Sequence, residues 1–319
     1  MTLWTTGLFT GVGSLPGQDP LEAARYVHDA LAVPHLPELP ARQWYGDLAG
    51  RGAAFLVDLY VDLQPTGWRM VPRPSRVGQR AIDLLRRDID AFEEVGAQPE
   101  LIKVQATGPW TLATLLELNR GAKVLADHGA VHDLTESLAE GVRLHIADLQ
   151  RRFPSATIAV QLDEPSLPAV LAARIPTASG FGTLRAPTPQ TARERLATVL
   201  GVHEHTVVHC CAPRPPVALL VDAGAKALSL DAAMLDPRDD DDLGVAIEKG
   251  VGMLLGVLPT HGPLPSVRRV LETVGRLRDR VGLSDVTVTP ACGLAGSTWD
   301  EVKAITTRLQ EVAQALGDQ

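Results

Sequence analysis

The sequence is poor in cysteine, in aromatic residues and in positive charge, and each scarcity excludes a class of protein. Three cysteines in 319 residues are too few, and odd in number, for a disulfide framework. Aromatic residues make up only 4%, and 30 lysines and arginines stand against 38 acidic residues, a net charge of −8. Because a nucleic-acid partner requires a basic surface, this charge argues against one. No apolar run reaches the about 18 residues of a membrane span, and no secretory signal opens the chain, so we expect a cytoplasmic protein without a membrane partner.

What the sequence does contain is a globular composition, 45% hydrophobic and 21% charged, with short apolar runs between helical stretches. Apolar residues recur at helical spacing in 81–92, 131–149 and 267–277. Eight runs predict strands, at 8–12, 33–36, 101–106, 157–162, 206–210, 227–230, 253–257 and 285–289. Strands that alternate with helices predict a parallel sheet, and eight of them predict a closed barrel. With no linker or repeat in the sequence, we expect residues 1–319 to form a single (β/α)8 TIM barrel.

The second of these strands is the weakest of the eight predictions. Residues 53–63 are also strongly apolar and compete for its place, but Asp58 and Asp62 are four residues apart, which favours a helix with one polar stripe. The acidic run Asp239–Asp242 precedes another apolar periodic stretch. It lacks the spaced oxygens and the glycine of a calcium loop, so we interpret it as the first turn of a helix.

Polar residues at the carboxyl ends of the predicted strands are informative, because barrel enzymes place their chemistry there. His209 and Cys211 end the fifth strand and are two residues apart, so they share a face, while Cys210 points to the helical layer. A lone pair of this kind is more often an ordinary core or surface pair. Asp231, however, ends the sixth strand, and Cys292 follows the eighth. One imidazole, two thiols and one carboxylate at one rim predict a tetrahedral zinc site.

The charge of this ligand set indicates which chemistry it favours. Two thiolates, one carboxylate and a neutral imidazole leave a bound zinc ion with a net charge near −1, which makes it a poor Lewis acid for hydrolysis. Such a centre still lowers the pKa of an incoming thiol and keeps the thiolate nucleophilic. Alkyl transfer to a thiol therefore fits better than hydrolysis. A structural zinc site is the alternative, although such sites usually use cysteine and histidine alone.

Further polar residues follow other strands. Ser14, Glu38 and Asp163 come after the first, second and fourth strands, where two carboxylates and a hydroxyl suit the ammonium and carboxylate of an amino acid. Helix capping or loop solvation is the alternative for each of them. His261 follows the seventh strand and is a candidate general acid or base, since an unperturbed histidine titrates near pH 6.5.

Together these residues resemble the catalytic barrel of the cobalamin-independent methionine synthase family. The elements that match occur in the family's order over nearly the whole chain: Gly13-Ser14-Leu15-Pro16, Thr107-Gly108-Pro109-Trp110-Thr111, Gln161-Leu162-Asp163-Glu164-Pro165, His209-Cys210-Cys211 and Pro290-Ala291-Cys292-Gly293-Leu294. Each element is short, but the set is specific. Uroporphyrinogen decarboxylases and coenzyme M methyltransferases share the wider superfamily, and the decarboxylases lack the cysteines.

The resemblance implies zinc held by His209, Cys211 and Cys292, with Asp231 in place of the family's usual glutamate. It implies that Ser14, Glu38 and Asp163 bind the amino-acid part of homocysteine, and that His261 lies near the substrate. The implied reaction transfers a methyl group to homocysteine and forms methionine. Full-size members carry a second barrel for methylfolate, and this chain is similar to the short members, so the donor is either methyltetrahydrofolate or a methylcorrinoid. A coenzyme M type thiol alkyltransferase and a non-catalytic barrel with structural zinc are the alternatives.

Overall fold

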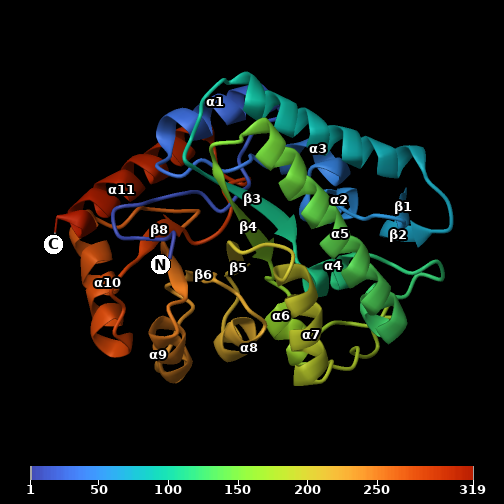
Figure 1. The fold of residues 1–319 in the computed structure, drawn as a ribbon. Helices are drawn as coiled ribbons and strands as arrows, with labels where there is room; N and C mark the ends of the chain where they lie inside the picture. The colour runs from blue at the N-terminus through green and yellow to red at the C-terminus, as the bar shows by residue number, and fades with distance from the viewer. Residues whose placement is uncertain (1, 319) are drawn as a thin grey trace.

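A parallel six-stranded sheet forms the centre of the protein, which a computed structural model describes over residues 2–318 (Figure 1). The strands follow one another in chain order and curl into a barrel-like wall, which confirms the predicted α/β fold class. Their bounds are β3 (Leu101–Thr107), β4 (Thr157–Asp163), β5 (Thr206–Cys210), β6 (Ala227–Asp231), β7 (Gly252–Leu258) and β8 (Thr287–Pro290).

The first two predicted strands do not form regular strands, and the prediction of eight was wrong in this respect. Two extended segments nevertheless bridge the gap between β8 and β3. The first segment (8–12) pairs with β8, because Thr10 N donates to Val288 O over 3.2 Å. It also pairs with the second segment (33–36), because Val33 N donates to Phe9 O. The second pairs with β3, where Leu36 N donates to Lys103 O over 2.9 Å.

The irregularity of these two segments has a cause in the sequence. Pro34 and Pro37 have no N–H to donate, so a regular ladder cannot continue through them. In the first segment, Gly11 and Gly13 leave room for neighbouring side chains, since a Cβ at Gly11 would collide with the His35 ring. The barrel therefore closes through single bridges instead of continuous strands.

The side chains of the strands alternate between the interior of the barrel and the helical layer. Six buried apolar residues form a separate plug at the amino ends of the strands: Trp4, Val33, Ala159, Val207, Ala227 and Leu254. The next residues on the same faces are polar, as in Gln161, His209 and Ser229. The opposite faces belong to the main hydrophobic core, which includes Cys210. The plug thus closes the bottom of the barrel and leaves a polar interior above it.

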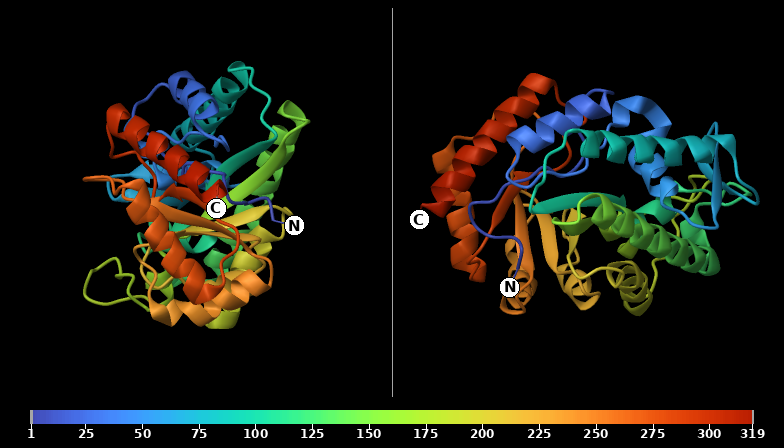
Figure 2. Two further views of the ribbon diagram at one scale, coloured as in Figure 1. Left: turned by 90° about the vertical axis from the view of Figure 1, so that its left-hand side faces the viewer. Right: turned by 45° about the horizontal axis from the view of Figure 1, so that its top comes forward.

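Helices cover the outside of the sheet (Figure 2). Their bounds are α1 (Pro20–Ala30), α2 (Leu48–Ala54), α3 (Arg76–Glu94), α4 (Pro109–Leu115), α5 (His128–Arg152), α6 (Leu167–Leu171), α7 (Pro189–Leu200), α8 (Val217–Asp222), α9 (Asp240–Glu248), α10 (Val267–Val281) and α11 (Trp299–Gly317), with 3₁₀ turns at Pro40–Tyr45, Val124–Ala126 and Pro237–Asp239. The last helix lies against α10, whereas residues 2–4 lie at the amino ends of β5, β6 and β7. The three predicted helical stretches lie within α3, α5 and α10. Between residues 2 and 318, no helix is both long and apolar enough to span a bilayer.

Two local predictions on helices had different outcomes. The acidic run does begin a helix, with Asp240, Asp241 and Asp242 in the first turn of α9, where carboxylates oppose the positive end of the helix dipole. The continuous helix expected over 53–63 was wrong. α2 ends at Ala54, Asp58 takes a left-handed backbone with φ 57°, and Tyr60–Gln64 becomes β1 of a hairpin with β2 (Gly67–Val71). A left-handed residue stops a helix, so the apolar residues here pack from a strand.

Candidate metal and substrate site

Three of the predicted metal ligands meet at the carboxyl end of the barrel. His209 is the penultimate residue of β5, Cys211 comes directly after the strand, and Cys292 comes two residues after β8. One ligand atom from each residue lies within 4.8 Å of the other two, and the two Sγ atoms are 3.4 Å apart. Two sulfurs bound at about 2.3 Å to a tetrahedral zinc ion would be roughly 3.8 Å apart, so this spacing is close to that of a ligand pair.

The His209 ring is oriented so that one nitrogen is left for a ligand. Its Nδ1 hydrogen-bonds the Ser229 hydroxyl over 3.0 Å, and its Nε2 is buried without a hydrogen-bond partner among residues 2–318. A buried polar atom without a partner is costly. In metal sites the second histidine nitrogen is typically held by a neighbouring polar group, as Ser229 does here. The donor set and the unpaired Nε2 therefore fit a zinc ion. Ser229 was missed in the sequence, although strand alternation places it on the same face as Asp231.

The two thiols of this cluster, Cys211 and Cys292, have pKa values shifted in opposite directions. The hydrogen bond from Cys211 and the nearby His209 lower the pKa of Cys292, while the same contact and burial raise the pKa of Cys211. One thiol is thus disposed to ionise at the expense of the other. A cation between the two sulfurs would favour both thiolates, which is the state that metal ligation needs.

Asp231 lies beside the cluster, but its carboxylate is not one of the ligand atoms that the structure groups together. Its Oδ1 accepts a hydrogen bond of 2.9 Å from Ala233 N in its own loop. Burial raises the pKa of Asp231, with a further contribution from the charge of Cys292. Because only Oδ1 is engaged in this bond and no atom of the carboxylate belongs to the cluster, ligation by Asp231 stays a prediction.

Ser14 and Glu38 are neighbours across the two bridging segments and adjoin the metal cluster. Leu15 N donates to Glu38 O over 2.9 Å, and Glu38 N donates to Gly13 O over 3.1 Å. The loop after Cys292 lies directly on the serine, because a Cβ at Gly293 would collide with the Ser14 hydroxyl. This contact explains why a glycine follows Cys292.

Glu38 is also the end of a chain of buried charges that the sequence analysis missed. Arg51 Nε contacts Glu38 Oε1 at 3.0 Å, and Arg51 Nη1 contacts Asp88 Oδ2 at 2.6 Å. Arg42 completes the chain with two bonds of 2.7 and 2.8 Å to the two oxygens of Asp88. Charges this deeply buried need partners, and here each carboxylate has at least one. The partners come from α2 and α3, far apart in the sequence, so no local motif could have revealed them.

Asp163 ends β4 in register with His209 and is fully buried. Its Oδ1 accepts from Gln161 Nε2 over 2.7 Å, and the Oε1 of the same glutamine accepts from Lys103 Nζ over 2.7 Å. Burial raises the pKa of Asp163 to about 7 and lowers the pKa of Lys103 to about 7. Asp163 and Glu38 are thus both held by buried polar partners, Asp163 by Gln161 and Glu38 by Arg51, and their role in binding substrate stays a prediction.

Glu164, the neighbour of Asp163, has a structural part in the same rim. Its carboxylate accepts from Trp110 N over 2.9 Å and from Thr111 N over 2.8 Å, at the start of α4. The Thr-Gly-Pro-Trp-Thr and Asp-Glu-Pro elements are therefore joined to each other, and Gly108 is required because a Cβ there would strike Glu164. Burial raises the pKa of Glu164 to about 7 against these hydrogen bonds.

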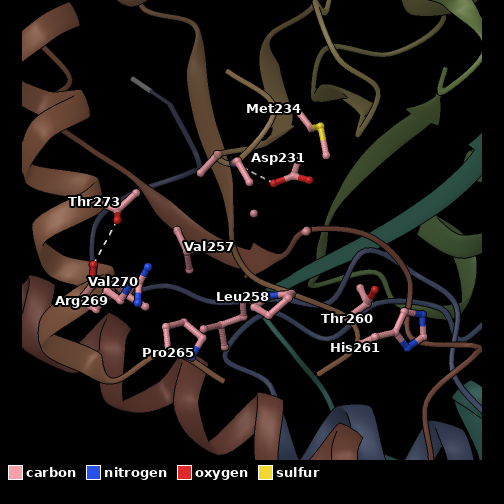
Figure 3. A pocket seen from close by; sticks show the side chains of 15 residues that line it. Asp231, Met234, Val257, Leu258, Thr260, His261, Pro265, Arg269, Val270 and Thr273 are labelled. Atoms are coloured by element: carbon pink, nitrogen blue, oxygen red, sulfur yellow. Dashed lines mark hydrogen bonds between the residues drawn. The ribbon is translucent and has the colours of Figure 1, made fainter. Parts of the chain in front are cut away.

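His261 lies on an exposed loop after β7, against Gly296. It lines a cavity of about 470 Å3 that also reaches Asp231 and Ala291, the residue before Cys292 (Figure 3). The structure thus brings His209, Cys211 and Cys292 into contact, and places His261 and Asp231 along the walls of the adjoining cavity. The role of each residue stays a prediction.

Comparison with known proteins identifies the family. The sequence model of the cobalamin-independent synthase catalytic domain matches residues 5–315. The chain belongs to the cobalamin-independent methionine synthase family. No relative was found among curated protein sequences. Membership of this family implies methyltransferase chemistry, and the order of the short motifs along the chain agrees with it.

Solved structures agree on the fold. A B12-independent methionine synthase from Shewanella sp. W3-18-1, in complex with selenomethionine, has a TM-score of 0.65 at 12% identity, and 98% of each chain is covered. A putative vitamin-B12 independent methionine synthase from Listeria monocytogenes has the same TM-score at 14% identity, with 99% of each chain covered. At such identities the likeness shows a shared barrel-type fold of similar length.

Proposed function

We propose that this methionine synthase-type chain is a zinc-dependent methyltransferase that acts on the thiol of homocysteine and forms methionine. The donor is methyltetrahydrofolate or a methylcorrinoid. The observation that carries the proposal is the meeting of His209, Cys211 and Cys292 at the barrel rim, where the buried His209 Nε2 has no hydrogen-bond partner within residues 2–318. Zinc, when bound, supplies one piece of chemistry, a lowered pKa for the thiol that coordinates it.

The residues around the cluster have complementary tasks in this proposal. Glu38 and Asp163 hold the ammonium group of homocysteine, and Ser14 holds its carboxylate. Ser229 keeps the His209 ring in place, and the Arg51 guanidinium keeps Glu38 in place. The barrel thereby holds the thiol and the methyl group at attack distance, which accounts for a large part of such rate enhancements. His261 accepts or delivers the proton that the reaction releases or needs. The selenomethionine in the Shewanella enzyme, an analogue of the product, supports an amino-acid thioether at this site.

Zinc X-ray absorption on the purified chain, with and without L-homocysteine, tests the proposal. The expected result is one zinc ion with two sulfur ligands, rising to three when homocysteine is added. Cys211→Ser should remove one sulfur, whereas Cys210→Ser, the matched control, should leave the spectrum unchanged because Cys210 belongs to the hydrophobic core. If no zinc is bound, or if the number of its sulfur ligands does not change when homocysteine is added, the proposed mechanism is wrong and only the family and the fold remain.

The two alternatives give different results in simple assays. A coenzyme M type alkyltransferase would prefer a different thiol, so initial rates over a panel of thiols separate it from a homocysteine enzyme. A barrel with structural zinc would unfold when a chelator removes the metal. The proposed catalytic site should lose activity while its circular dichroism spectrum stays nearly unchanged, because the core does not depend on the metal.

A further inference from the structure

The polar interior of the barrel, above the apolar plug, contains a glutamine that the proposed function does not use. Gln161 lies on β4, two residues before Asp163, and is fully buried. Its Nε2 donates to Asp163 Oδ1 over 2.7 Å and to Val12 O over 2.9 Å, and its Oε1 accepts from Lys103 Nζ over 2.7 Å. Both polar atoms of the amide thus have partners, which a buried amide requires.

The neighbours of Gln161 determine which way round its amide lies. The ammonium of Lys103 can only donate, so it selects the amide oxygen, and the carboxylate of Asp163 accepts, so it selects the amide nitrogen. Lys103 is itself held in place, because its Nζ also donates to Val12 O over 2.8 Å. A flipped amide would bring two donors together at Lys103 and two acceptors together at Asp163. The amide therefore has one favourable orientation.

The same amide connects two parts of the expected substrate site. Val12, whose carbonyl accepts from Gln161, is two residues before Ser14. After the serine, Leu15 N donates to Glu38 O over 2.9 Å, so the backbone is fixed on both sides of Ser14. Through its second N–H, Gln161 holds the carboxylate at the end of β4. It thus sets the distance between the hydroxyl expected to bind the substrate carboxylate and a carboxylate expected to bind its ammonium group.

A neutral amide can hold Asp163 without neutralising its charge. Glu38, the other carboxylate expected to bind the ammonium group, contacts the Arg51 guanidinium at 3.0 Å, which compensates its charge. Asp163 forms no ion pair with any cation among residues 2–318, because Gln161 lies between it and Lys103. An ammonium group in the site would therefore meet a carboxylate that no cationic side chain of the protein already contacts.

We propose that Gln161 is a positioning residue for the amino-acid substrate. By holding Asp163 and the Val12 carbonyl together, it fixes the geometry that makes the site select thiols with an α-amino group. The inference rests on the proposed function and names the residue on which the selectivity of that site depends. Lys103 acts through Gln161, since it fixes the orientation of the amide.

Isothermal titration of the zinc-loaded full chain with L-homocysteine and, separately, with 4-mercaptobutyrate tests the inference. The second compound has the same thiol and carboxylate but lacks the amino group, so the ratio of the two Kd values measures the selectivity. Gln161→Met removes both N–H donors and keeps a side chain of similar length. It should reduce the preference for homocysteine roughly tenfold, the size expected for a lost hydrogen bond to a charged group. The Kd for 4-mercaptobutyrate should change little.

A neighbouring glutamine provides the matched control. Gln105 on β3 is also buried and donates to the same Val12 O over 3.2 Å, but its side chain makes no bond to Asp163. Gln105→Met should therefore keep the wild-type preference. Because Gln161→Met leaves the buried Lys103 with one partner fewer, the double variant Lys103→Met/Gln161→Met is the second test. It removes the buried ammonium as well, Val12 O keeps its donor from Gln105, and the preference should again fall.

The outcomes separate this inference from the proposed function. If the wild type binds both thiols equally, Asp163 does not hold an ammonium group, and the amino-acid site and the inference are both wrong. If the wild type prefers homocysteine and Gln161→Met and the double variant keep that preference, the inference alone is overturned. A merely structural role for Gln161 would weaken the binding of both thiols alike and leave their ratio unchanged. Zinc content should equal that of the wild type in every variant.

Discussion

The two sides of the barrel rim differ in which polar groups already have partners from the protein. On one side, which we call the open side, the buried His209 Nε2 has no hydrogen-bond partner among residues 2–318 and lies close to the thiols of Cys211 and Cys292, which contact each other. On the other, the paired side, Glu38 and Asp88 are paired with Arg51 and Arg42, and the one polar atom of this network that is buried without a hydrogen-bond partner among residues 2–318 is Arg51 Nη2. On the open side the unpaired atom is a potential metal ligand, whereas on the paired side the carboxylates already have partners from the protein, which suits a frame that holds the site.

The largest expected effect comes from the open side. Changing Cys292 to Ser removes one of three ligand atoms, so zinc should be lost and methyl transfer to homocysteine should fall below detection. The free energy of unfolding should stay almost unchanged, because Cys292 is exposed and contributes little to the core. Zinc content by mass spectrometry and urea unfolding are the two measurements. Tight zinc binding by the variant would show that Asp231 and the two remaining residues suffice.

The next largest effect comes from the paired side and has the opposite character. Arg51→Met leaves Glu38 and Asp88 buried with less compensation, which should cost about 3–5 kcal/mol in the free energy of unfolding. Urea unfolding measures it, with Arg86→Met as the control, because the Arg86–Asp83 pair is exposed and long at 3.8 Å. Zinc content should not change in the folded fraction. A loss below about 1 kcal/mol, the size for a surface pair, would mean that the network is not rigidly buried.

The contrast between the two sides also explains what the sequence could predict. His209 and Cys211 share a strand, and strand ends in a parallel barrel converge, so their meeting with Cys292 followed from local pattern and topology. Glu38 was found in the same way, but Arg51 and Asp88 were not. Their pairing depends on how α2 and α3 pack on each other, which no spacing in the sequence encodes.

Backbone details were the other point where the sequence was insufficient. The first two strands have the right place and the right neighbours, yet Pro34 and Pro37 remove the donors that a regular ladder needs. The stretch 53–63 had the apolar content of a helix. A single left-handed residue, Asp58, divides it, and hairpin pairing with β2 outweighs the helical pattern. In the first case prolines within the apolar run decided the structure, and in the second the hydrogen bonds of the hairpin outweighed the local pattern.

A smaller effect should come from the hydroxyl that supports the open side. Ser229→Ala removes the hydrogen bond to His209 Nδ1 without removing a ligand. Losses of this kind typically lower metal affinity about 10- to 100-fold. Competition with a chromogenic chelator measures the change, and Ser137→Ala is a control because that buried serine bonds the backbone at Val57, away from the cluster. Equal zinc affinity in the two variants would show that His209 is oriented by packing alone.

The smallest expected effect is on the pH dependence of the free energy of unfolding, through two buried histidines, of which His145 lies near Arg51 of the paired side. Burial lowers the pKa of His35 and of His145 to about 3, and the charge of Lys103 or Arg51 adds to the shift. A histidine with a depressed pKa binds fewer protons when folded, so stability should be full above pH 6.5 and should decline as pH falls from 6.5 towards 3. At pH 5.5 each histidine should cost about 1.4 kcal/mol relative to pH 8.

His145→Gln tests that expectation most cleanly, because it removes one titrating ring that packs on Phe55 at the edge of the paired side. The loss of unfolding free energy between pH 8 and pH 5.5 should shrink by about 1.4 kcal/mol. His132→Gln, which alters an exposed histidine on the same helix, should leave the pH dependence as it is. If the two variants had equal pH profiles, His145 would have to be accessible to protons in the folded state. The paired side would then be a solvated region, and its contrast with the open side would no longer hold.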